Sequence, residues 1–206
     1  MKLDGRASLM KMENTPELTT ERLLLRRFRP GDEEDLFAIY RDREVNRFLP
    51  WFPFETLSQA EEQLAKELAF YRNPAGYRYA ICLKEEDRPI GYLKVDEGES
   101  HDFGYGLRKE YWNQGIVTEA GQALLLRLKE AGYRYITATH DRDNPRSGQV
   151  MNRLGMRYQY SYEELWQPKN LQVIFRMYQL NFDGNQDRVY KGYWDTAKVR
   201  FVEAIR

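Results

Sequence analysis

The segment Tyr111–Thr118 (YWNQGIVT) has the residue types and the position expected of an anion-binding loop. It lies between a strand-like run, Phe103–Leu107, and a helix-like run that ends at Gly132. The first N–H groups of a helix have no partner within the helix, and the helix dipole is positive there. Gly115 allows the backbone to approach a phosphate closely. The segment therefore predicts a site for a phosphate group.

Composition excludes several classes of protein. The chain has 206 residues, enough for one domain with a sizeable core, and 32 Lys and Arg balance 32 Asp and Glu. With no basic excess, we expect neither a nucleic acid nor an anionic membrane as a partner. The single cysteine, Cys82, excludes an internal disulfide and is predicted to be a small buried hydrophobe. No metal-ligand spacing, membrane-length apolar run or signal peptide is present, so we expect a cytoplasmic protein without a metal.

Hydrophobic periodicity predicts the elements that position the loop. A first helix follows Asp32, and a second covers Ser58–Arg72, with Ser58 and Glu61 as its capping box. A strand at 133–140 directly after the loop's helix favours a parallel crossover. The predicted strands are 18–28, 77–84, 90–95, 103–107, 133–140 and a closing hairpin over 156–166 and 170–181; a further helix runs from Asn144 to Gly155, and the tail after residue 187 is expected to form a last helix.

The aromatic segment Phe48–Phe54 is predicted to be neither helix nor strand, because Pro50 and Pro53 interrupt regular hydrogen bonding. Its aromatic side chains have two possible roles. They plug into the core, or they form a wall of a substrate cleft, and both roles are compatible.

Two spaced motifs carry a family resemblance. YWNQGIVTEA and, downstream, NPRSGQVMNRLGM resemble motifs A and B of the GNAT acyltransferase superfamily, and TERLLLRRF, RFLPWFPF and FGYGLRKEYW are similar to its RimJ/RimL-type branch. The resemblance covers Leu18 to Asn181. It implies an α/β (α+β) fold with a mixed, mostly antiparallel sheet, whose one parallel pair splays at a coenzyme A site, flanked by helices. Residues 18–182 are then one GNAT domain, 1–17 a disordered or cloning-derived leader, and 183–206 a C-terminal extension.

The resemblance also implies acetyl-CoA as the acyl donor. Its pyrophosphate is expected on the loop and its pantetheine arm between the strands at 103–107 and 133–140. Asn113 stands where the family prefers glycine, a mild change because Asn tolerates left-handed backbone angles. Val117 replaces a small residue and is expected to crowd a phosphate. The expected cofactor-binding residues are Leu107, Arg108, Asn113, Gln114, Gly115, Ile116, Val117, Thr118 and Asn144.

The leaving thiolate requires a hydrogen-bond donor, and the choice lies in motif B. Many GNAT enzymes have a tyrosine where this chain has Met151, which cannot donate a proton. The RimL-like alternative is a serine, which matches Ser147. A serine hydroxyl holds its proton tightly, so we expect it to stabilise the thiolate by a hydrogen bond. The alternative role for Ser147 is a cap of the helix that starts at Asn144.

The base that receives the amine's proton has several candidates. Asp102 precedes the strand that supplies the carbonyl-polarising peptide group, and we choose it first. Glu163 and Glu164 lie near the glutamate of RimL-like enzymes, but neighbouring strand residues face opposite ways, so at most one faces the cleft. Of these two glutamates, we take Glu164 as the second candidate catalytic residue. His101 and His140 have suitable acidities but little else to single them out.

The sequence therefore favours an N-acetyltransferase that moves an acetyl group from acetyl-CoA to a primary amine. The acceptor is a protein N-terminus or a small amine, and the protein is expected to be a monomer or a homodimer. A non-catalytic acyl-CoA sensor on the same fold is the alternative, because Met151 and Val117 depart from the family pattern. A nucleotide-binding protein is less favoured, since the loop lacks both the P-loop lysine and a G-x-G-x-x-G pattern.

Overall fold

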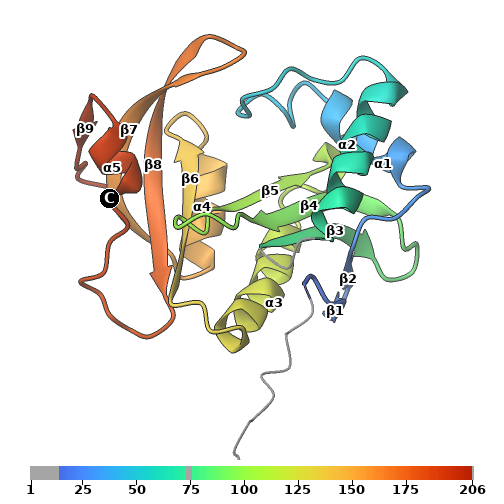
Figure 1. Cartoon of the computed structure of the whole chain (residues 1–206), viewed down its shortest axis with the longest axis horizontal. Helices are drawn as coiled ribbons and strands as arrows, with labels where there is room; N and C mark the ends of the chain where they lie inside the picture. The colour runs from blue at the N-terminus through green and yellow to red at the C-terminus, as the bar shows by residue number, and fades with distance from the viewer. Residues whose placement is uncertain (1–13, 73–75, 206) are drawn as a thin grey trace, which may run out of the picture.

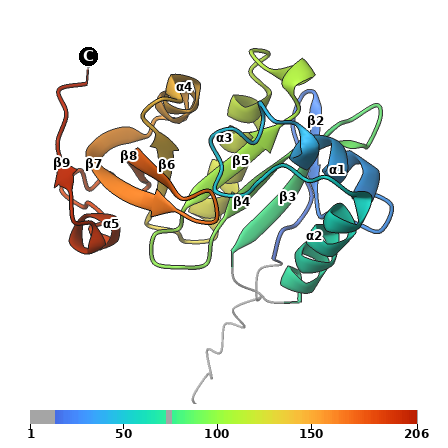
Figure 2. The same cartoon turned by 90° about the horizontal axis from the view of Figure 1, so that it is seen from above.

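Two β-sheets meet along one edge in the computed structural model, which describes residues 14–72 and 76–205 (Figures 1 and 2). The first sheet is antiparallel throughout and has the order β1-β2-β3-β4-β5. Its strands are β1 (Leu18–Thr19), β2 (Leu23–Arg26), β3 (Tyr77–Leu83), β4 (Pro89–Val95) and β5 (Phe103–Leu107). The second, also antiparallel, has the order β6-β8-β7-β9. Its strands are β6 (Tyr135–Asp141), β7 (Arg157–Trp166), β8 (Leu171–Asn181) and β9 (Arg200–Phe201).

Among the described residues, one isolated parallel bridge links the two sheets, between Asp102 and Thr137 next to the start of β5. A weak bond from the Thr137 N–H to the His101 carbonyl, 3.4 Å long, supports it. Beyond the bridge β5 and β6 diverge, since they belong to separate sheets. The predicted fold class, a mixed sheet with one splayed parallel pair and flanking helices, is confirmed.

Helices cover both faces of the first sheet. In Figure 1, α1 and α2 lie on one side of β3 and β4, and α3 crosses on the other. α4 follows β6 directly and packs beside it, and α5 lies against the outer strands of the second sheet. The helices are α1 (Glu33–Arg41), α2 (Leu57–Phe70), α3 (Ile116–Glu130), α4 (Pro145–Arg153) and α5 (Gly192–Thr196), and one 3-10 turn covers Lys109–Tyr111.

Strand alternation divides the core into layers. Inward residues of β2 and β3 pack with α3 and β6, and the opposite face of β3 packs with α1 and α2. Cys82 is fully buried in the second of these clusters, as predicted. The first cluster includes Leu23, Leu25, Tyr79, Ile81, Ala120, Leu124 and Ile136; the second includes Phe28, Leu36, Ile39, Ala60, Leu64 and Ala80.

The prediction of one strand over residues 18–28 was wrong, because the chain turns back at Thr20 to form β1 and β2. The Thr20 hydroxyl donates to a Glu119 carboxylate oxygen at 2.6 Å, and Arg22 pairs with the same carboxylate. This long-range anchor on α3 favours a turn over a continuous strand. The sequence of residues 18–28 is rich in leucine and contains no local signal for this turn.

Two other boundaries differ from prediction. α2 begins at Leu57, and the Gln59 carboxamide, rather than Glu61, accepts the N–H of Thr56 at 3.1 Å. The predicted helix in the tail is the short α5, after which the chain adds β9 to the edge of β7.

The packed part of the chain already includes Asn14 and Thr15, both of which are buried. The Pro16 carbonyl accepts the Tyr79 hydroxyl at 2.7 Å. A leader was expected over residues 1–17. Its residues 1–13 lie outside the described part of the chain. Within the described ranges, 14–72 and 76–205, no helix has the length and apolar character needed to cross a bilayer.

Candidate active site

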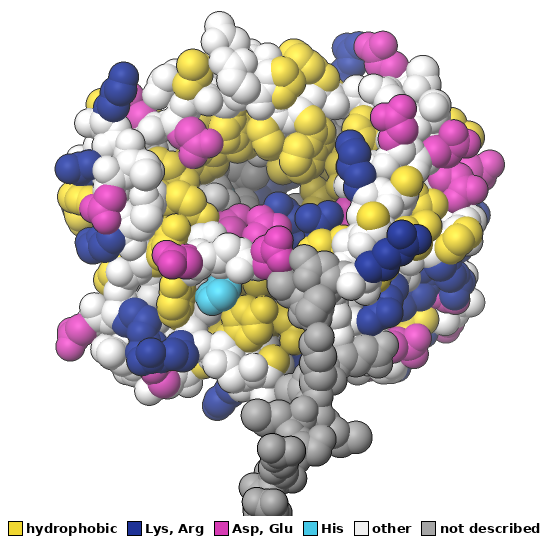
Figure 3. All heavy atoms as spheres, viewed as in Figure 1, with side chains coloured by type: hydrophobic (Ala, Val, Ile, Leu, Met, Phe, Trp, Pro, Cys, Tyr) yellow, Lys and Arg dark blue, Asp and Glu magenta, His cyan; other side chains and the backbone are white. Residues whose placement is uncertain are grey.

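A cavity of about 750 Å³ occupies the wedge where β5 and β6 diverge. Figure 3 shows a hollow between the two halves of the molecule, with hydrophobic side chains around it and charged side chains at its bottom. The cavity wall combines β5, the start of α3, the end of β6, the start of α4, the 44–51 segment and the inner side of the β7–β8 hairpin. These elements bring together sequence motifs that lie far apart in the chain.

The predicted anion-binding loop forms one end of this cavity. Asn113 and Gly115 both have left-handed backbone angles, with φ of 61° and 76°, and Gly115 is the N-cap of α3. Such angles suit asparagine and glycine and strain other residues. Arg22 braces the loop from β2 by donating to the Gln114 carbonyl at 3.0 Å while it pairs with Glu119. The loop is therefore held in a shape that presents the N-terminus of α3 to the cavity.

Individual loop residues differ in their orientation. Asn113, Gly115 and Thr118 line the cavity, whereas Gln114 does not and donates its side-chain amide to the Glu110 carbonyl at 2.9 Å. Ile116 and Val117 also contribute to the wall, but both pack in the core. Val117, which we expected to crowd a phosphate, is only 7% exposed.

The peptide groups of β5 differ in what they offer a pantetheine arm. The Arg108 N–H donates to the Ile90 carbonyl of the first sheet at 2.8 Å, so it is already occupied. The Leu107 carbonyl accepts the Trp112 indole N–H at 2.8 Å. Because hydrogen-bonding groups alternate along a strand, the N–H groups of Tyr105 and Leu107 point away from β4 and towards the gap. Leu107 thus keeps the position predicted for it, and Arg108 does not.

Asp102 lies in the same cavity, at the junction of the two sheets. The residue as a whole is partly covered, but its Oδ1 atom is enclosed and has no hydrogen-bond partner among the described residues. Loss of solvent raises the pKa of Asp102 to about 7, with Asp96 and Glu164 adding to the effect and Lys94 opposing it. A carboxyl group with this pKa is half-ionised at neutral pH and suits the role of a general base.

The two glutamates of β7 face different surroundings. Glu164 lines the cavity, and partial burial raises its pKa. Glu163 is not part of the cavity wall and accepts a long hydrogen bond from Gln172 on the neighbouring strand, at 3.4 Å. The alternation of strand side chains therefore places Glu164 towards Asp102, which agrees with the mutual effect on the Asp102 pKa.

The two histidines lie in different surroundings, since His140 lines the cavity and His101 does not. His101 packs against the Tyr133 and Tyr135 rings outside the cavity, and partial burial lowers its pKa. His140 is buried against α4, where a Cβ added at Gly148 would lie 2.8 Å from its Nε2 atom. Its Nδ1 atom lies 2.8 Å from the Asp141 carbonyl, and burial lowers its pKa. Gly148 thus allows the ring to support the start of α4.

Ser147 lies in the first turn of α4 and faces the cavity. Its Oγ atom is 2.7 Å from the hydroxyl of Tyr105, which comes from β5 on the other side of the wedge. Met151 is fully buried in the core cluster. Sequence reasoning missed Tyr105, although alternation with Phe103 and Leu107 placed it on an inward face.

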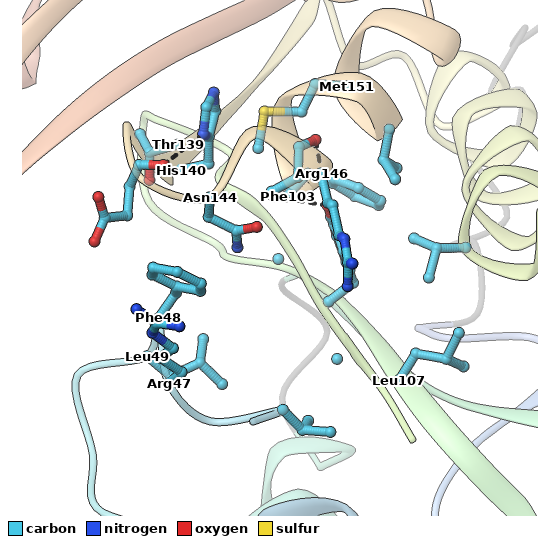
Figure 4. Close-up of a pocket in the computed structure, with 18 of the residues that line it drawn as sticks. Arg47, Phe48, Leu49, Phe103, Leu107, Thr139, His140, Asn144, Arg146 and Met151 are labelled. Carbon is cyan, nitrogen blue, oxygen red and sulfur yellow. Dashed lines mark hydrogen bonds between the residues drawn. The ribbon is translucent and has the colours of Figure 1, made fainter. Parts of the chain in front are cut away.

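Asn144 is the N-cap residue of α4, but its side chain makes no cap hydrogen bond. Its backbone carbonyl instead accepts the Ser147 N–H at 3.1 Å. Figure 4 shows Asn144 and Arg146 extending from the start of α4 into the space opposite Phe48. The carboxamide is therefore available to a ligand in the cavity.

The aromatic segment Phe48–Phe54 both packs into the core and lines the cavity. Trp51 and Phe54 pack with α1 and α2, and the Tyr40 and Phe54 rings stack at 4.8 Å. Phe48 and Trp51 line the cavity. Across the cleft, the Lys169 ammonium on the β7–β8 hairpin donates to the Asn46 carbonyl at 2.9 Å. The hairpin and the 45–54 segment thus form a roof between the two sheets.

The described residues contain no group of three or more His, Cys, Asp or Glu side chains that could hold a metal ion. The cavity presents the glycine-capped start of α3, the Asp102 carboxyl group with its raised pKa, and the Ser147 and Tyr105 hydroxyl groups.

Comparison with known proteins agrees with this geometry. Residues 22–157 match the family model described as an acetyltransferase (GNAT) domain. YnaD of Bacillus subtilis strain 168, an uncharacterised N-acetyltransferase, is 28% identical over 144 residues, which is 68% of this chain and 82% of YnaD. The crystal structure of a GNAT-family acetyltransferase from Bacillus anthracis has a TM-score of 0.72 at 24% identity, covering 82% of this chain and 99% of that one. RimL, a ribosomal L7/L12 alpha-N-protein acetyltransferase solved with coenzyme A, also has a TM-score of 0.72, at 17% identity over 82% of this chain and 99% of its own.

The fold and the site define an acyltransferase of the GNAT type. The family match extends over most of the chain, so this protein belongs to the GNAT acetyltransferase family.

Proposed function

We propose that this protein transfers the acetyl group of acetyl-CoA to a primary amine. The observation that carries the proposal is the shared cavity, in which the glycine-containing start of α3, the near-neutral Asp102 and the Ser147 hydroxyl face one gap between β5 and β6. The coenzyme A found in the RimL structure and the acetyl-CoA and AMP found in the MccE structure support the donor.

The donor occupies the wedge lengthwise. Its pyrophosphate accepts hydrogen bonds from backbone N–H groups at the start of α3, where the helix dipole is favourable. Its pantetheine arm runs along β5 and pairs with the Leu107 N–H. The Asn144 carboxamide orients the arm from α4.

The groups proposed to carry out the reaction lie at the other end of the wedge. Asp102, directly or through a water molecule, accepts the proton that the amine must lose to attack. The thioester carbonyl develops negative charge, which a β5 peptide N–H near Leu107 stabilises. When the C–S bond breaks, its electron pair remains on sulfur, and the Ser147 hydroxyl donates a hydrogen bond to that thiolate.

The acceptor half is bounded by aromatic side chains and by Glu164. Phe48, Trp51 and Trp166 contribute flat apolar walls, and the Glu164 carboxylate offers a partner for a cationic amine. This composition suits either a peptide N-terminus or a small organic amine.

The test is calorimetric titration with CoA, followed by detection of free thiol released from acetyl-CoA with a panel of N-terminal peptides and small amines. Binding with amine-dependent thiol release is the expected result. Binding without release for any amine would identify an acyl-CoA sensor on the same fold. Absence of CoA binding would overturn the proposal.

A further inference from the structure

The Tyr105 hydroxyl is a polar group of the wedge to which the proposed function gives no role. It lies 2.7 Å from Ser147 Oγ and 3.4 Å from the Ser147 carbonyl. Tyr105 comes from the middle of β5 and Ser147 from the first turn of α4. The contact therefore spans the gap in which the thioester is proposed to lie.

We propose that Tyr105 is a positioning residue that orients the Ser147 hydroxyl towards the sulfur of CoA. This inference rests on the proposed function, because it assigns a partner to the serine proposed to stabilise the thiolate. In it, the Tyr105 hydroxyl donates to Ser147 Oγ, and the Ser147 hydrogen is left to donate to sulfur. No proton is transferred between the two hydroxyl groups.

The direction of the hydrogen bond follows from chemistry. A phenol is a stronger acid than an aliphatic alcohol and is the stronger donor. Burial raises the pKa of Tyr105 to about 12, so the phenol stays protonated at neutral pH and can act as a donor. The Ser147 carbonyl, the other oxygen near the phenol, can only accept. The phenol has a single hydrogen, and the shorter contact, 2.7 Å to Ser147 Oγ against 3.4 Å to the Ser147 carbonyl, favours its donation to Oγ.

A serine hydroxyl on its own is free to rotate and can turn to other acceptors near its own backbone. Occupying the Oγ lone pair from the β5 side restricts that rotation. It also polarises the Ser147 O–H bond, because hydrogen bonds in a chain strengthen one another. Tyr105 thus supplies from β5 a phenol hydroxyl. Many GNAT enzymes have a tyrosine at the α4 position that is here the buried Met151.

The experiment uses bound CoA and requires no knowledge of the acceptor. CoA affinity is measured by calorimetry as a function of pH for the wild type, Tyr105→Phe and Ser147→Ala, with desulfo-CoA as the ligand that lacks the thiol. The difference between the two ligands at each pH reports the pKa of the bound thiol. An oriented donor should lower it below the pKa of the thiol of free CoA, titrated under the same conditions.

We expect Ser147→Ala to raise the pKa of the bound thiol by about one pH unit, the scale of one hydrogen bond to a charged group. Tyr105→Phe should raise it by at least half as much while Ser147 is still present. The double variant should show no further shift, because both residues act through one hydrogen bond to sulfur. Desulfo-CoA affinity should be unchanged in all three.

The chain offers a matched control. Tyr158 and Ser161 form a second hydroxyl pair at 2.9 Å on β7, outside the cavity wall, so Tyr158→Phe removes the same kind of contact, together with the bond from the Glu203 N–H at 2.9 Å, without approaching sulfur. It should leave the thiol pKa unchanged. Thermal unfolding of each variant verifies that the fold is retained.

The outcomes separate the two proposals. A thiol pKa that shifts in Ser147→Ala but not in Tyr105→Phe would overturn the role of Tyr105 and leave the proposed function intact. Equal shifts in Tyr105→Phe and Tyr158→Phe would also overturn it, because they would indicate a general structural effect. If the wild type bound no CoA, the proposed function itself would fail.

Discussion

Asp102 is a carboxyl group of the cavity whose pKa is strongly altered by its place in the fold. Its pKa is raised from about 3.9 in an unfolded chain to about 7. Between these two values the folded protein holds a proton that the unfolded chain releases. The stability associated with the neutral carboxyl group is therefore fully present below about pH 4 and is lost as the pH rises through about 7.

Asp102→Asn should remove this pH dependence. Relative to its stability at pH 4, the wild type should lose about 2 kcal/mol by pH 8. A pKa shift of about three pH units sets an upper limit of about 4 kcal/mol for this loss. Partial access of Asp102 to solvent lowers the loss below that limit. The variant should lack this component. Urea unfolding at pH 4, 6 and 8 measures the difference. Parallel stability curves for the two proteins would show that the Asp102 pKa is not raised.

The same substitution should affect turnover in a pH-dependent way. If Asp102 is the base, Asp102→Asn should lower kcat by about a hundredfold at neutral pH, within the range for losing general base catalysis, and by much less at high pH, where the amine is already neutral. Glu164→Gln, made beside it, should reduce acceptor affinity more than kcat. A uniform loss across pH would assign Asp102 to positioning, and a larger loss in Glu164→Gln would transfer the role of base to that residue.

Residues near the site were predicted with uneven success, for physical reasons. Gly115, Ser147 and Asn144 stand in local motifs, so their placement beside the cavity was accessible from sequence. The Tyr105–Ser147 contact joins residues 42 positions apart, and only the geometry of the two sheets determines that they meet. The occupied Arg108 N–H depends likewise on the register of β5 against β4.

At the scale of elements, the loop before α3 depends on backbone conformation more than on space. A Cβ at Gly115 would meet nothing nearer than Arg22 at 3.8 Å, so its left-handed angle is the constraint. Gly132, just beyond the other end of α3, has φ of +83° and open space around it. A Cβ added at either glycine would therefore cause the same kind of backbone strain, at opposite ends of α3.

Gly115→Ala should weaken CoA binding by at least about tenfold, whereas Gly132→Ala should not change it. Both should lower stability by about 1 kcal/mol, the cost of a left-handed residue with a Cβ. Calorimetry with CoA and urea unfolding measure the two effects. Similar CoA affinity in both variants would count against the assignment of the loop to the pyrophosphate.

Element boundaries show what local sequence can and cannot establish. α1 and α4 begin or end at residues with clear cap signals, such as Pro145, and their extents agree closely with prediction, whereas α3 ends near Gly132 as predicted but already begins at Ile116, within the predicted loop. The turn between β1 and β2 depends on Glu119, about 100 residues away, and no local signal predicts it. The closing hairpin of β7 and β8 was predicted correctly, whereas the hairpin of β1 and β2 was not predicted.

At the scale of the whole molecule, Lys169 adds a connection between the two halves across the cleft. Its ammonium group donates to the Asn46 carbonyl, and burial lowers its pKa. Lys169→Met keeps most of the side-chain length but removes the donor. Backbone amides of residues 45–54 and 166–171 should then exchange with deuterium several-fold faster, because the roof loses its cross-connection.

Lys198→Met, at an exposed position on the outer side of the second sheet, is the control and should leave exchange in both segments unchanged. In Lys169→Met, we also expect bulky amine acceptors to gain relative to slender ones, as measured by kcat/KM. Unaltered exchange in both segments would indicate that the roof is held by packing of the aromatic residues alone.

The single parallel bridge at Asp102 and Thr137 has a mechanical consequence. If the two sheets rotate slightly against each other, the bridge is the pivot, and displacement increases with distance from it. The gap can then widen to admit a long pantetheine arm while the carboxyl group at the pivot hardly moves. We therefore expect such an opening of the gap to leave the position of the Asp102 carboxyl group nearly unchanged.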